Sequence, residues 1–393
     1  MVKVVIVSGL LPSGHYTENL AGGLNKIKKL KLLIYTDLRK ENLQVKKCGK
    51  VIPVWSKSPK FIFQILGRLL KDKPDVVHFQ HEINMFGGLA TAVIFPFLLI
   101  SARFLKIKIA TTVHATVKSD QIDSEFVETF NQNPKIIKPI FLKLFFRFLY
   151  KSICQFSDLC FVHTNTAKSV LLSYYPHGQK KIKVIATAIP LVDSKKYKKE
   201  KYFLYFGYIA RRKGLENLIQ GFKEFCKKNP KSKFKLLLAG GVIKGQEESL
   251  QELQKTISTA KLKNKIKYLG FLEKNIQNKL YKQAYGVVIP AKLSISASGP
   301  LYHAFSHGKF VLASNVGHLK DEIKSGYNGY LIPNTDWSRG FSKAIKNPIW
   351  VKKIESGSLF TAYQRTPLKT ARKYFKSYSL LLQRMYNKKN EIA

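Results

Sequence analysis

Short apolar runs alternate with helix-like segments along the first half of the chain. Each run is continuous, and loop or helix signals follow it. Continuous apolar strands that are separated by helices are typical of a parallel sheet with both faces covered. The strands predicted for this half are VKVVIVSGL, KLLIYT, DVVHFQ, IKIATTVH, LCFVHT and KIKVIAT.

The second half repeats this pattern after a polar, lysine-rich stretch. Its predicted strands are YFLYFG, FKLLLAGG, KIKYLGF, GVVIP, FVLAS and NGYLIP. We therefore predict an α/β fold with two doubly wound, Rossmann-like domains, residues 1–190 and 203–365, joined by a linker at 191–202. An amphipathic helix over about 366–393 is expected to pack back on the first domain. Ligands of such sheets bind beyond the carboxyl ends of the strands, so two facing domains would enclose a cleft.

The chain is strongly basic, with 68 Lys and Arg against 24 Asp and Glu and a net charge of +44. This balance favours an anionic partner, which can be nucleic acid, an acidic membrane surface or a phosphorylated substrate. The cations are spread along the whole sequence, so charge alone does not choose among these. The sequence contains no helix-turn-helix, RRM or OB-like pattern, which makes nucleic acid the least favoured partner.

The four cysteines form no CxxC pair, which argues for a reducing compartment. The apolar start, residues 1–11, has only Lys3 ahead of it and no cleavage-site pattern after it, so no secretion signal is expected. The longest apolar run, residues 86–104, is interrupted by Gly87, Gly88 and Pro96. A buried helix is therefore favoured there over a membrane span. Together these features predict a cytoplasmic protein.

A cationic turn stands out at residues 206–222, FGYIARRKGLENLIQGF. An apolar strand ends at Gly207, a loop carries Arg211, Arg212 and Lys213, and helical spacing begins after Gly214. Cations beside a helix N-terminus suit a phosphorylated ligand. Taken alone, the turn is equally compatible with solvated cations.

Together with the strand pattern, these segments resemble the GT-B glycosyltransferases of the family 4 (group 1) type, over nearly the whole chain. GYIARRKGLENLIQGF is similar to that family's donor-phosphate loop, and LLLAGG, with Gly240 and Gly241, to the next strand and loop. The resemblance implies that Lys213 and Arg212, with Arg211 in support, bind the nucleotide diphosphate. SASGPLYHAF resembles the donor-binding region. Backbone N–H groups of its turn would contact the phosphates; the turn comprises Ser298, Gly299, Pro300 and Leu301.

Segments of the first half resemble the acceptor side of the same family. IATTVHAT places His114 where the family has a strand-end histidine near the reacting sugar, which implies a catalytic role. An imidazole there can hydrogen-bond the sugar or acceptor, or it can be a buried, structurally paired histidine. PDVVHFQHEINMFGG implies that His81 and Glu82 contact the acceptor. SGLLPSGHYTENLAGGL resembles the loop that closes over the donor, with Gly14 and His15.

The chain departs from the family pattern at two carboxylates. The family often carries Glu-x7-Glu in the donor region, and Ile295 and His303 stand at those positions. The chain therefore resembles the subgroup that lacks this pair. His303 either reaches the donor ribose in place of a glutamate or serves in capping or packing.

No metal is expected. The sequence has no DxD, the pattern with which metal-dependent transferases hold a divalent cation on a diphosphate. His78, His81 and Glu82 resemble a metal cluster only in composition, because two histidines three residues apart at the end of a strand have poor ligand geometry. The substrate implied is a nucleotide sugar, bound without a cofactor.

The segment at residues 140–153, IFLKLFFRFLYKSI, carries Lys143, Arg147 and Lys151 at helical spacing. We expect a helix that is packed on its sheet with one charged face exposed. The alternative is a cationic helix that lies on an anionic bilayer.

The sequence thus predicts a metal-independent, retaining glycosyltransferase that moves a sugar from a nucleotide-diphosphate sugar to a glycan or lipid-linked glycan. Its expected place is the cytoplasm, with peripheral association at the inner face of the plasma membrane as an addition. The alternatives are a catalytically degenerate scaffold with the transferase fold and a basic protein that binds nucleic acid.

Overall fold

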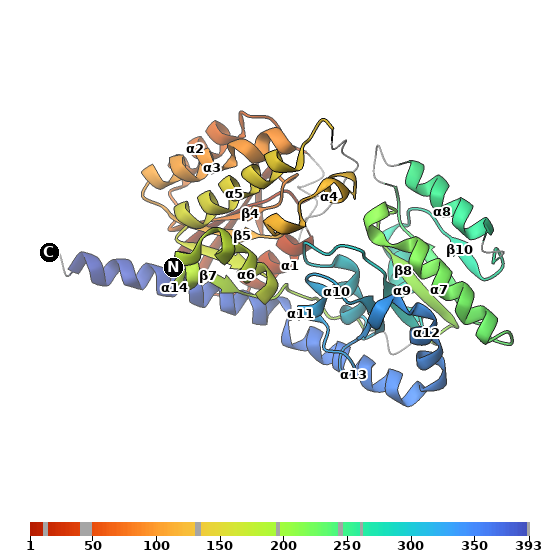
Figure 1. Cartoon of the computed structure of the whole chain (residues 1–393). Coiled ribbons are helices and arrows are strands. Elements are labelled where there is room, and N and C mark those ends of the chain that lie inside the picture. Colours follow the sequence, from red (N-terminus) through yellow and green to blue (C-terminus); the bar gives the residue numbers. More distant parts are fainter. Residues whose placement is uncertain are drawn as a thin grey trace. The chain divides into compact units, whose positions relative to one another are not determined.

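The computed structural model describes residues 1–10, 15–39, 49–129, 135–193, 197–242, 247–259 and 262–390 (Figure 1). The chain divides into two compact units, each with its own parallel sheet. Unit 1 comprises Met1–Ile122, Lys138–Ala188 and Arg365–Ala393. Unit 2 comprises Asp123–Ile137 and Ile189–Gln364, so the short helix α4 (Ser124–Thr129) is grouped with the second unit.

Unit 1 contains a seven-stranded parallel sheet in the order β3-β2-β1-β4-β5-β6-β7. Six of its strands coincide with predicted apolar runs. The sequence pattern missed the edge strand β3, which contains Pro53 and is only partly buried, as is typical of proline in a sheet. The strands are β1 (Val2–Val7), β2 (Leu30–Asp37), β3 (Lys50–Trp55), β4 (Val76–His81), β5 (Lys108–Val113), β6 (Leu159–Val162) and β7 (Ile182–Val184).

Helices cover both faces of this sheet (Figure 1). Successive side chains of a strand point to opposite faces, and on β4 the His78 ring contacts Tyr378 of α14, whereas the Phe79 ring contacts Phe95 of α3. Therefore α14 and α3 lie on opposite faces. Helix α1 packs against α14, while α2, α5 and α6 share the side of α3. The helices are α1 (His15–Leu24), α2 (Phe61–Asp72), α3 (Leu89–Phe104), α5 (Pro139–Phe156), α6 (Asn165–Tyr174) and α14 (Pro367–Asn390).

Helix α5 is less buried than its sequence indicates. Phe146, Leu149 and Ile153 pack inward as expected. The expectation that the other apolar positions are buried as well is wrong, because several large side chains face solvent alongside the cations. These are Ile140, Phe141, Leu144 and Phe148.

Unit 2 contains a six-stranded parallel sheet in the order β10-β9-β8-β11-β12-β13. All six strands coincide with predicted apolar runs, so the doubly wound α/β class is confirmed for both halves. The strands are β8 (Tyr202–Phe206), β9 (Lys235–Ala239), β10 (Ile266–Tyr268), β11 (Gly286–Ile289), β12 (Phe310–Ser314) and β13 (Tyr330–Ile332).

The core of unit 2 joins α7 to α12 over the sheet. The Phe222 ring of α7 meets the Phe341 ring of α12 at 5.3 Å, and Phe203 of β8 meets the same ring at 4.7 Å. The helical spacing predicted after Gly214 is that of α7, whose apolar positions Leu215, Leu218, Ile219 and Phe222 are buried here. The remaining helices are α7 (Leu215–Lys228), α8 (Glu248–Thr259), α9 (Lys274–Gln283), α10 (Gly299–Ser306), α11 (Leu319–Glu322), α12 (Trp337–Lys346) and α13 (Pro348–Gln364).

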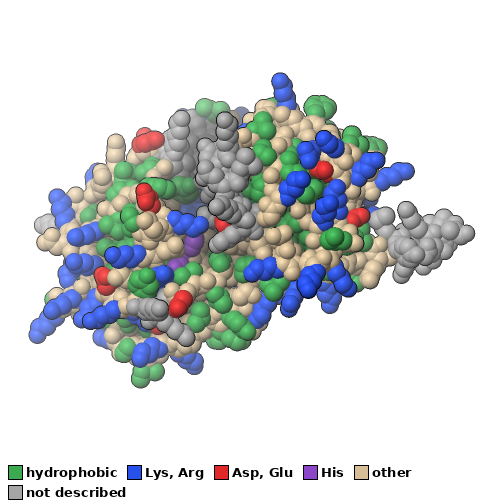
Figure 2. All heavy atoms as spheres, turned by 180° about the vertical axis from the view of Figure 1, so that it is seen from behind, with side chains coloured by type: hydrophobic (Ala, Val, Ile, Leu, Met, Phe, Trp, Pro, Cys, Tyr) green, Lys and Arg blue, Asp and Glu red, His purple; other side chains and the backbone are tan. Residues whose placement is uncertain are grey.

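Basic side chains are spread over the surface. On the face shown in Figure 2, Lys and Arg side chains lie between apolar and neutral ones over its whole extent, and Asp and Glu are sparse among them. This distribution agrees with the even spread of lysine along the sequence. The excess charge therefore marks no single nucleic-acid groove on that face.

Candidate functional site

The cationic turn of unit 2 is held in place by a glycine. After β8 the chain forms the short 3₁₀ helix η5 (Arg211–Lys213) and enters α7 through Gly214, whose φ is +64°. A Cβ on Gly214 would lie 2.1 Å from the carbonyl oxygen of Pro290. Only glycine tolerates both this left-handed backbone and this close approach. Gly214 therefore fixes the cations against the segment that follows β11.

We expect Gly214→Ala to destabilise unit 2 by more than about 3 kcal/mol, since the left-handed backbone costs ~1 kcal/mol and the clash adds to it. Gly326→Ala is the matched control: its φ is +84°, but an added Cβ would meet no atom within 4 Å. The control should lose only ~1 kcal/mol. Urea unfolding followed by the fluorescence of Trp337 and Trp350 measures both. Equal losses would show that the contact with Pro290 does not constrain the turn.

A pocket of about 90 Å³ opens beside this turn, within unit 2. Three segments line it: the end of β8 with η5, the chain after β11, and the start of α10. Strands β8 and β11 are neighbours in the sheet, so the pocket lies where ligands of open α/β sheets bind. The structure here brings together five residues that were predicted to bind the diphosphate: Arg212, Lys213, Ser298, Gly299 and Pro300.

Lys213 is the most perturbed cation of the pocket. Burial, and secondarily repulsion from Arg212, lowers the pKa of its ammonium group to about 8. Among the described residues no carboxylate forms an ion pair with it. A partly desolvated ammonium without a counter-charge is destabilised until an anion supplies one. The pocket is therefore electrostatically prepared for a phosphate.

Arg211 lies outside the pocket. Its guanidinium donates to the Glu252 carboxylate of α8 at 2.8 Å and lies 3.9 Å from that of Glu248. The side chain is 48% exposed, so water screens the pair. Arg211 thus serves to join the turn to α8, and the charge facing the pocket comes from Arg212 and Lys213.

The start of α10 offers fewer N–H donors than expected. Ser298 caps the helix, and its Oγ accepts from the N–H of Leu301 at 3.4 Å. Pro300 has no N–H, and Leu301 is fully buried. Within residues 299–301 only the Gly299 N–H can face a phosphate. A Cβ on Gly299 would meet no protein atom within 4 Å, so there is space beside it.

The remaining predicted donor residues have structural roles. Gly207 and Gly240 bring two loops into backbone contact, because a Cβ on Gly240 would lie 1.8 Å from the Gly207 carbonyl oxygen. Gly241 lies beside Phe271. His303 sits in the second turn of α10, with its ring 5.5 Å from that of Tyr281, and is not among the pocket-lining residues. In contrast, Ile295, one of the two positions at which the chain departs from the Glu-x7-Glu pattern that it resembles, does line the pocket.

In unit 1, His114 is buried and engaged at both ring nitrogens. Its Nε2 lies 2.8 Å from Oε1 of Gln80, and its Nδ1 lies 3.1 Å from Nε2 of His163. The Nδ1 of His163 donates to the carbonyl of Ile185 at 3.0 Å. Burial holds the pKa of His114 well below its ordinary value, so the ring is neutral. This geometry matches the second alternative, a buried and paired histidine.

Sequence reasoning missed the other members of this histidine chain. From Gln80 it continues to His78, whose Nδ1 lies 2.7 Å from the hydroxyl of Tyr378 on α14. Burial lowers the pKa of His78 to about 3. One signal was available: His163 directly follows β6 just as His114 directly follows β5, so neighbouring parallel strands place both rings at one edge.

The predicted acceptor residues are His81 and Glu82, and the predicted donor-loop residues are Gly14 and His15. The His81 ring packs on Phe95 at 4.6 Å, and burial lowers its pKa to about 4. It therefore faces α3 while His78 faces α14. Glu82 follows β4 and is half-buried. Gly14 and the side chain of His15 lie outside the described residues.

Within the part of the chain that the structure describes, no three His, Cys, Asp or Glu side chains are placed to hold a metal ion together. His78 and His81 point to opposite faces of the sheet, as their spacing indicated. No described helix combines the length and apolar character needed to cross a bilayer.

Two protein families match this sequence. Residues 14–192 match the family described as Glycosyltransferase Family 4, and residues 191–356 match that described as Glycosyl transferases group 1. An uncharacterised glycosyltransferase of Methanocaldococcus jannaschii is 31% identical over 130 residues. That alignment covers 33% of this chain and 31% of the relative, so it spans about a third of each.

Solved structures are similar over nearly the full length. HepE of Anabaena in complex with UDP-glucose has a TM-score of 0.73 at 14% identity, covering 96% of this chain and 100% of that one. The lipopolysaccharide outer core galactosyltransferase WaaB has a TM-score of 0.65 at 15% identity, covering 97% and 99%. At these identities the likeness establishes the fold.

Proposed function

Because the chain belongs to the GT-B glycosyltransferases of the family 4 (group 1) type, we propose that it transfers a sugar from a nucleotide-diphosphate sugar to an acceptor hydroxyl. The observation that carries this proposal is the pocket of unit 2, where Lys213 is half-buried and has no carboxylate partner among the described residues. The donor proposed is a UDP-sugar, in line with the HepE structures that contain UDP and UDP-glucose.

The chemistry proposed needs no metal. Transfer breaks the bond between the sugar C1 and the β-phosphate oxygen, and joins C1 to the acceptor oxygen. The acceptor's proton passes to the departing diphosphate. Negative charge grows on that diphosphate in the transition state, and Lys213 and Arg212 are placed to stabilise it. The absence of DxD from the sequence supports the same proposal. We further propose that the sugar configuration is retained.

The acceptor proposed is a glycan or lipid-linked glycan. The similar fold of WaaB, a galactosyltransferase of the lipopolysaccharide outer core, supports an acceptor of this class. In unit 1, the hydrogen-bonded series of histidines would keep the His114 ring neutral and in a fixed orientation at the edge of the sheet. We propose a cytoplasmic location with peripheral attachment to a membrane.

Two observations favour a second candidate, a degenerate transferase that serves as a scaffold. Ile295 lines the pocket where a carboxylate would bind sugar hydroxyls, and both His114 nitrogens are already engaged. A scaffold would bind neither nucleotide nor sugar in this pocket. The two candidates therefore differ in a binding measurement.

A thermal-shift screen against UDP-, GDP- and ADP-glucose separates these candidates. Ligand that binds only the folded protein raises its stability by about 2.7 kcal/mol at a concentration of a hundred times Kd. We expect a shift with UDP-glucose alone, and a smaller shift in Lys213→Ala. The absence of any shift would contradict the enzyme proposal and favour the scaffold. Tight RNA binding at physiological salt in addition would favour the nucleic-acid alternative.

A further inference from the structure

Three neighbouring helices of unit 1 leave large apolar side chains in solvent. Phe104 is 81% exposed and Phe63 is 78% exposed. The full set, which we call the apolar face, is Phe63 and Leu70 of α2, Val93, Phe97 and Phe104 of α3, and Ile140, Phe141, Leu144 and Phe148 of α5. Single exposed apolar residues are ordinary, but a set that recurs along three adjacent helices marks an interaction surface.

The helices that carry the apolar face adjoin one another. Helix α3 packs against both α2 and α5, and the three lie side by side on one face of the sheet (Figure 1). On α5 the exposed Ile140, Leu144 and Phe148 recur every four residues, so they form one stripe along the outward side. On α3 Val93 and Phe97 have the same spacing.

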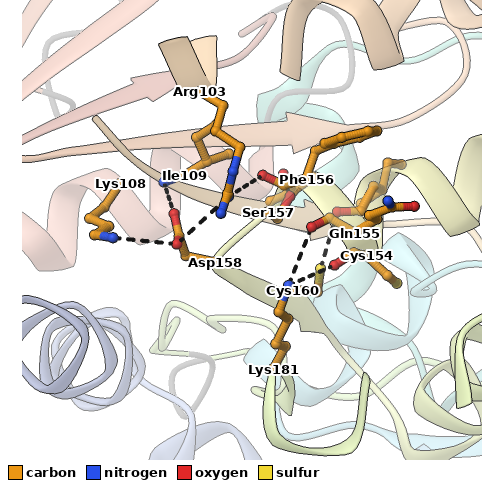
Figure 3. Close-up of polar contacts among 12 residues, drawn as sticks. Arg103, Lys108, Ile109, Cys154, Gln155, Phe156, Ser157, Asp158, Cys160 and Lys181 are labelled. Carbon is orange, nitrogen blue, oxygen red and sulfur yellow. Dashed lines mark hydrogen bonds and ion pairs between the residues drawn. The ribbon is translucent and has the colours of Figure 1, made fainter. Parts of the chain in front are cut away.

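Polar contacts fix α3 and α5 to each other and to the sheet (Figure 3). At the end of α3, Arg103 donates to the carbonyl of Phe156 at the end of α5, at 3.3 Å, and lies 3.9 Å from Asp158. Asp158 accepts from the N–H of Ile109 in β5 at 2.9 Å and lies 3.6 Å from Lys108. The apolar face is thus carried by helices that are tied down at their C-terminal ends.

The charges around the apolar face have one sign. The sequences of α3 and α5 contain no Asp or Glu, and the single carboxylate of α2, Asp72, is already paired with Arg68 at 2.7 Å. Exposed or half-buried cations stand among the apolar side chains: Lys60, Lys71, Lys138, Lys143, Arg147 and Lys151. Apolar side chains surrounded by cations complement the acyl boundary and phosphate groups of an anionic bilayer.

We propose that the apolar face of α2, α3 and α5 docks the protein on an anionic phospholipid bilayer. The helices lie in the plane of the surface, with the phenylalanine and leucine side chains in the headgroup region and the cations on lipid phosphates. Nucleic acid would match the cations but leave the aliphatic side chains without a partner. The proposal specifies the membrane attachment proposed above, and it does not require transferase activity.

Co-sedimentation with lipid vesicles tests this. We expect binding to phosphatidylcholine vesicles that contain phosphatidylglycerol, and at least tenfold weaker binding to phosphatidylcholine alone. Two double variants address the two components: Leu144→Gln with Phe148→Gln for the apolar part, and Arg147→Gln with Lys151→Gln for the charge. Each should weaken binding to the anionic vesicles about tenfold or more. The matched control is Phe360→Gln with Lys352→Gln, on an exposed side of α13 in unit 2, which should change binding less than twofold.

Two outcomes would overturn the proposal. One is equal binding to neutral and anionic vesicles, or none to either. The other is concentration-dependent self-association of the wild type that Leu144→Gln with Phe148→Gln abolishes, since the face would then bind a second copy of the chain. The melting temperature and the UDP-glucose shift of every variant are measured in parallel. They separate misfolding from lost docking, and failure of docking from failure of the proposed donor site.

Discussion

Lys213→Ala is expected to weaken UDP binding by about ten- to a hundredfold and to lower the transfer rate by about a hundred- to a thousandfold. A hydrogen bond to a charged group contributes about 1.5–3 kcal/mol, and the loss of one donor to a developing anion costs more in the transition state. Calorimetric titration with UDP and a transfer assay with UDP-glucose measure the two effects.

The matched control for this variant is Lys292→Ala. Lys292 follows β11 beside the pocket, but its ammonium group pairs with Glu216 and it does not line the pocket. Removing it takes away the same charge from nearly the same place, so its effect on UDP affinity should stay within about threefold. If both variants lost affinity equally, the pocket would be using the general positive potential of the surface.

The same lysine predicts a pH dependence of UDP binding. The pKa of Lys213 is lowered to about 8 in the free protein. Below pH 8 the ammonium is charged and affinity is fully present. Above pH 8 binding must take up a proton, so affinity falls about tenfold per pH unit until the pKa of the complex is reached. Lys213→Arg should remove this fall, because arginine keeps its charge throughout.

Acidification is expected to destabilise both units steeply between about pH 6.5 and pH 4. Burial lowers the pKa of five histidines: to about 4 for His81, His307 and His318, to about 3 for His78, and well below its ordinary value for His114. Unfolded histidines bind protons below pH 6.5, whereas these stay neutral in the fold. Their stabilisation is therefore fully present above pH 6.5 and is lost as the pH falls. For a shift of about 2.5 units the loss approaches 3 kcal/mol per histidine.

Urea unfolding at a series of pH values measures this loss. His81→Leu should reduce the slope of unfolding free energy against pH by up to about 1.4 kcal/mol per pH unit, because its ring packs on Phe95 and one titrating group disappears. His177→Leu, at an exposed position, should leave the slope unchanged. A wild-type stability that stays flat from pH 7 to pH 4.5 would contradict the burial of these rings.

The fold was predictable because its strands are buried on both faces and read as continuous apolar runs. Strand β3 was not predicted because Pro53 interrupts the strand pattern and because this edge strand is only partly buried. The exposure of apolar residues on α5 was not predicted for the opposite reason. Ile140 and Phe148 are as apolar as a core residue, and only the position of the neighbouring helices decides that nothing covers them.

The candidate site likewise contains residues that the sequence could predict and contacts that it could not. The residues that line the pocket could be anticipated from the family resemblance of two segments, which the neighbouring strands β8 and β11 bring together at Lys213 and Gly299. Side-chain partners that are distant in sequence could not be anticipated. Glu252, which engages Arg211, lies on another helix, and Tyr378, which bonds His78, comes from the last helix of the chain. These pairings depend on side-chain packing that apolar periodicity does not encode.

A crystal structure of the protein grown with UDP tests the central claim most directly. The account predicts the diphosphate in the pocket at the ends of β8 and β11, with phosphate oxygens within hydrogen-bonding distance of the Lys213 ammonium and the Gly299 N–H. UDP bound elsewhere, with the Lys213 pocket containing only solvent, would contradict it.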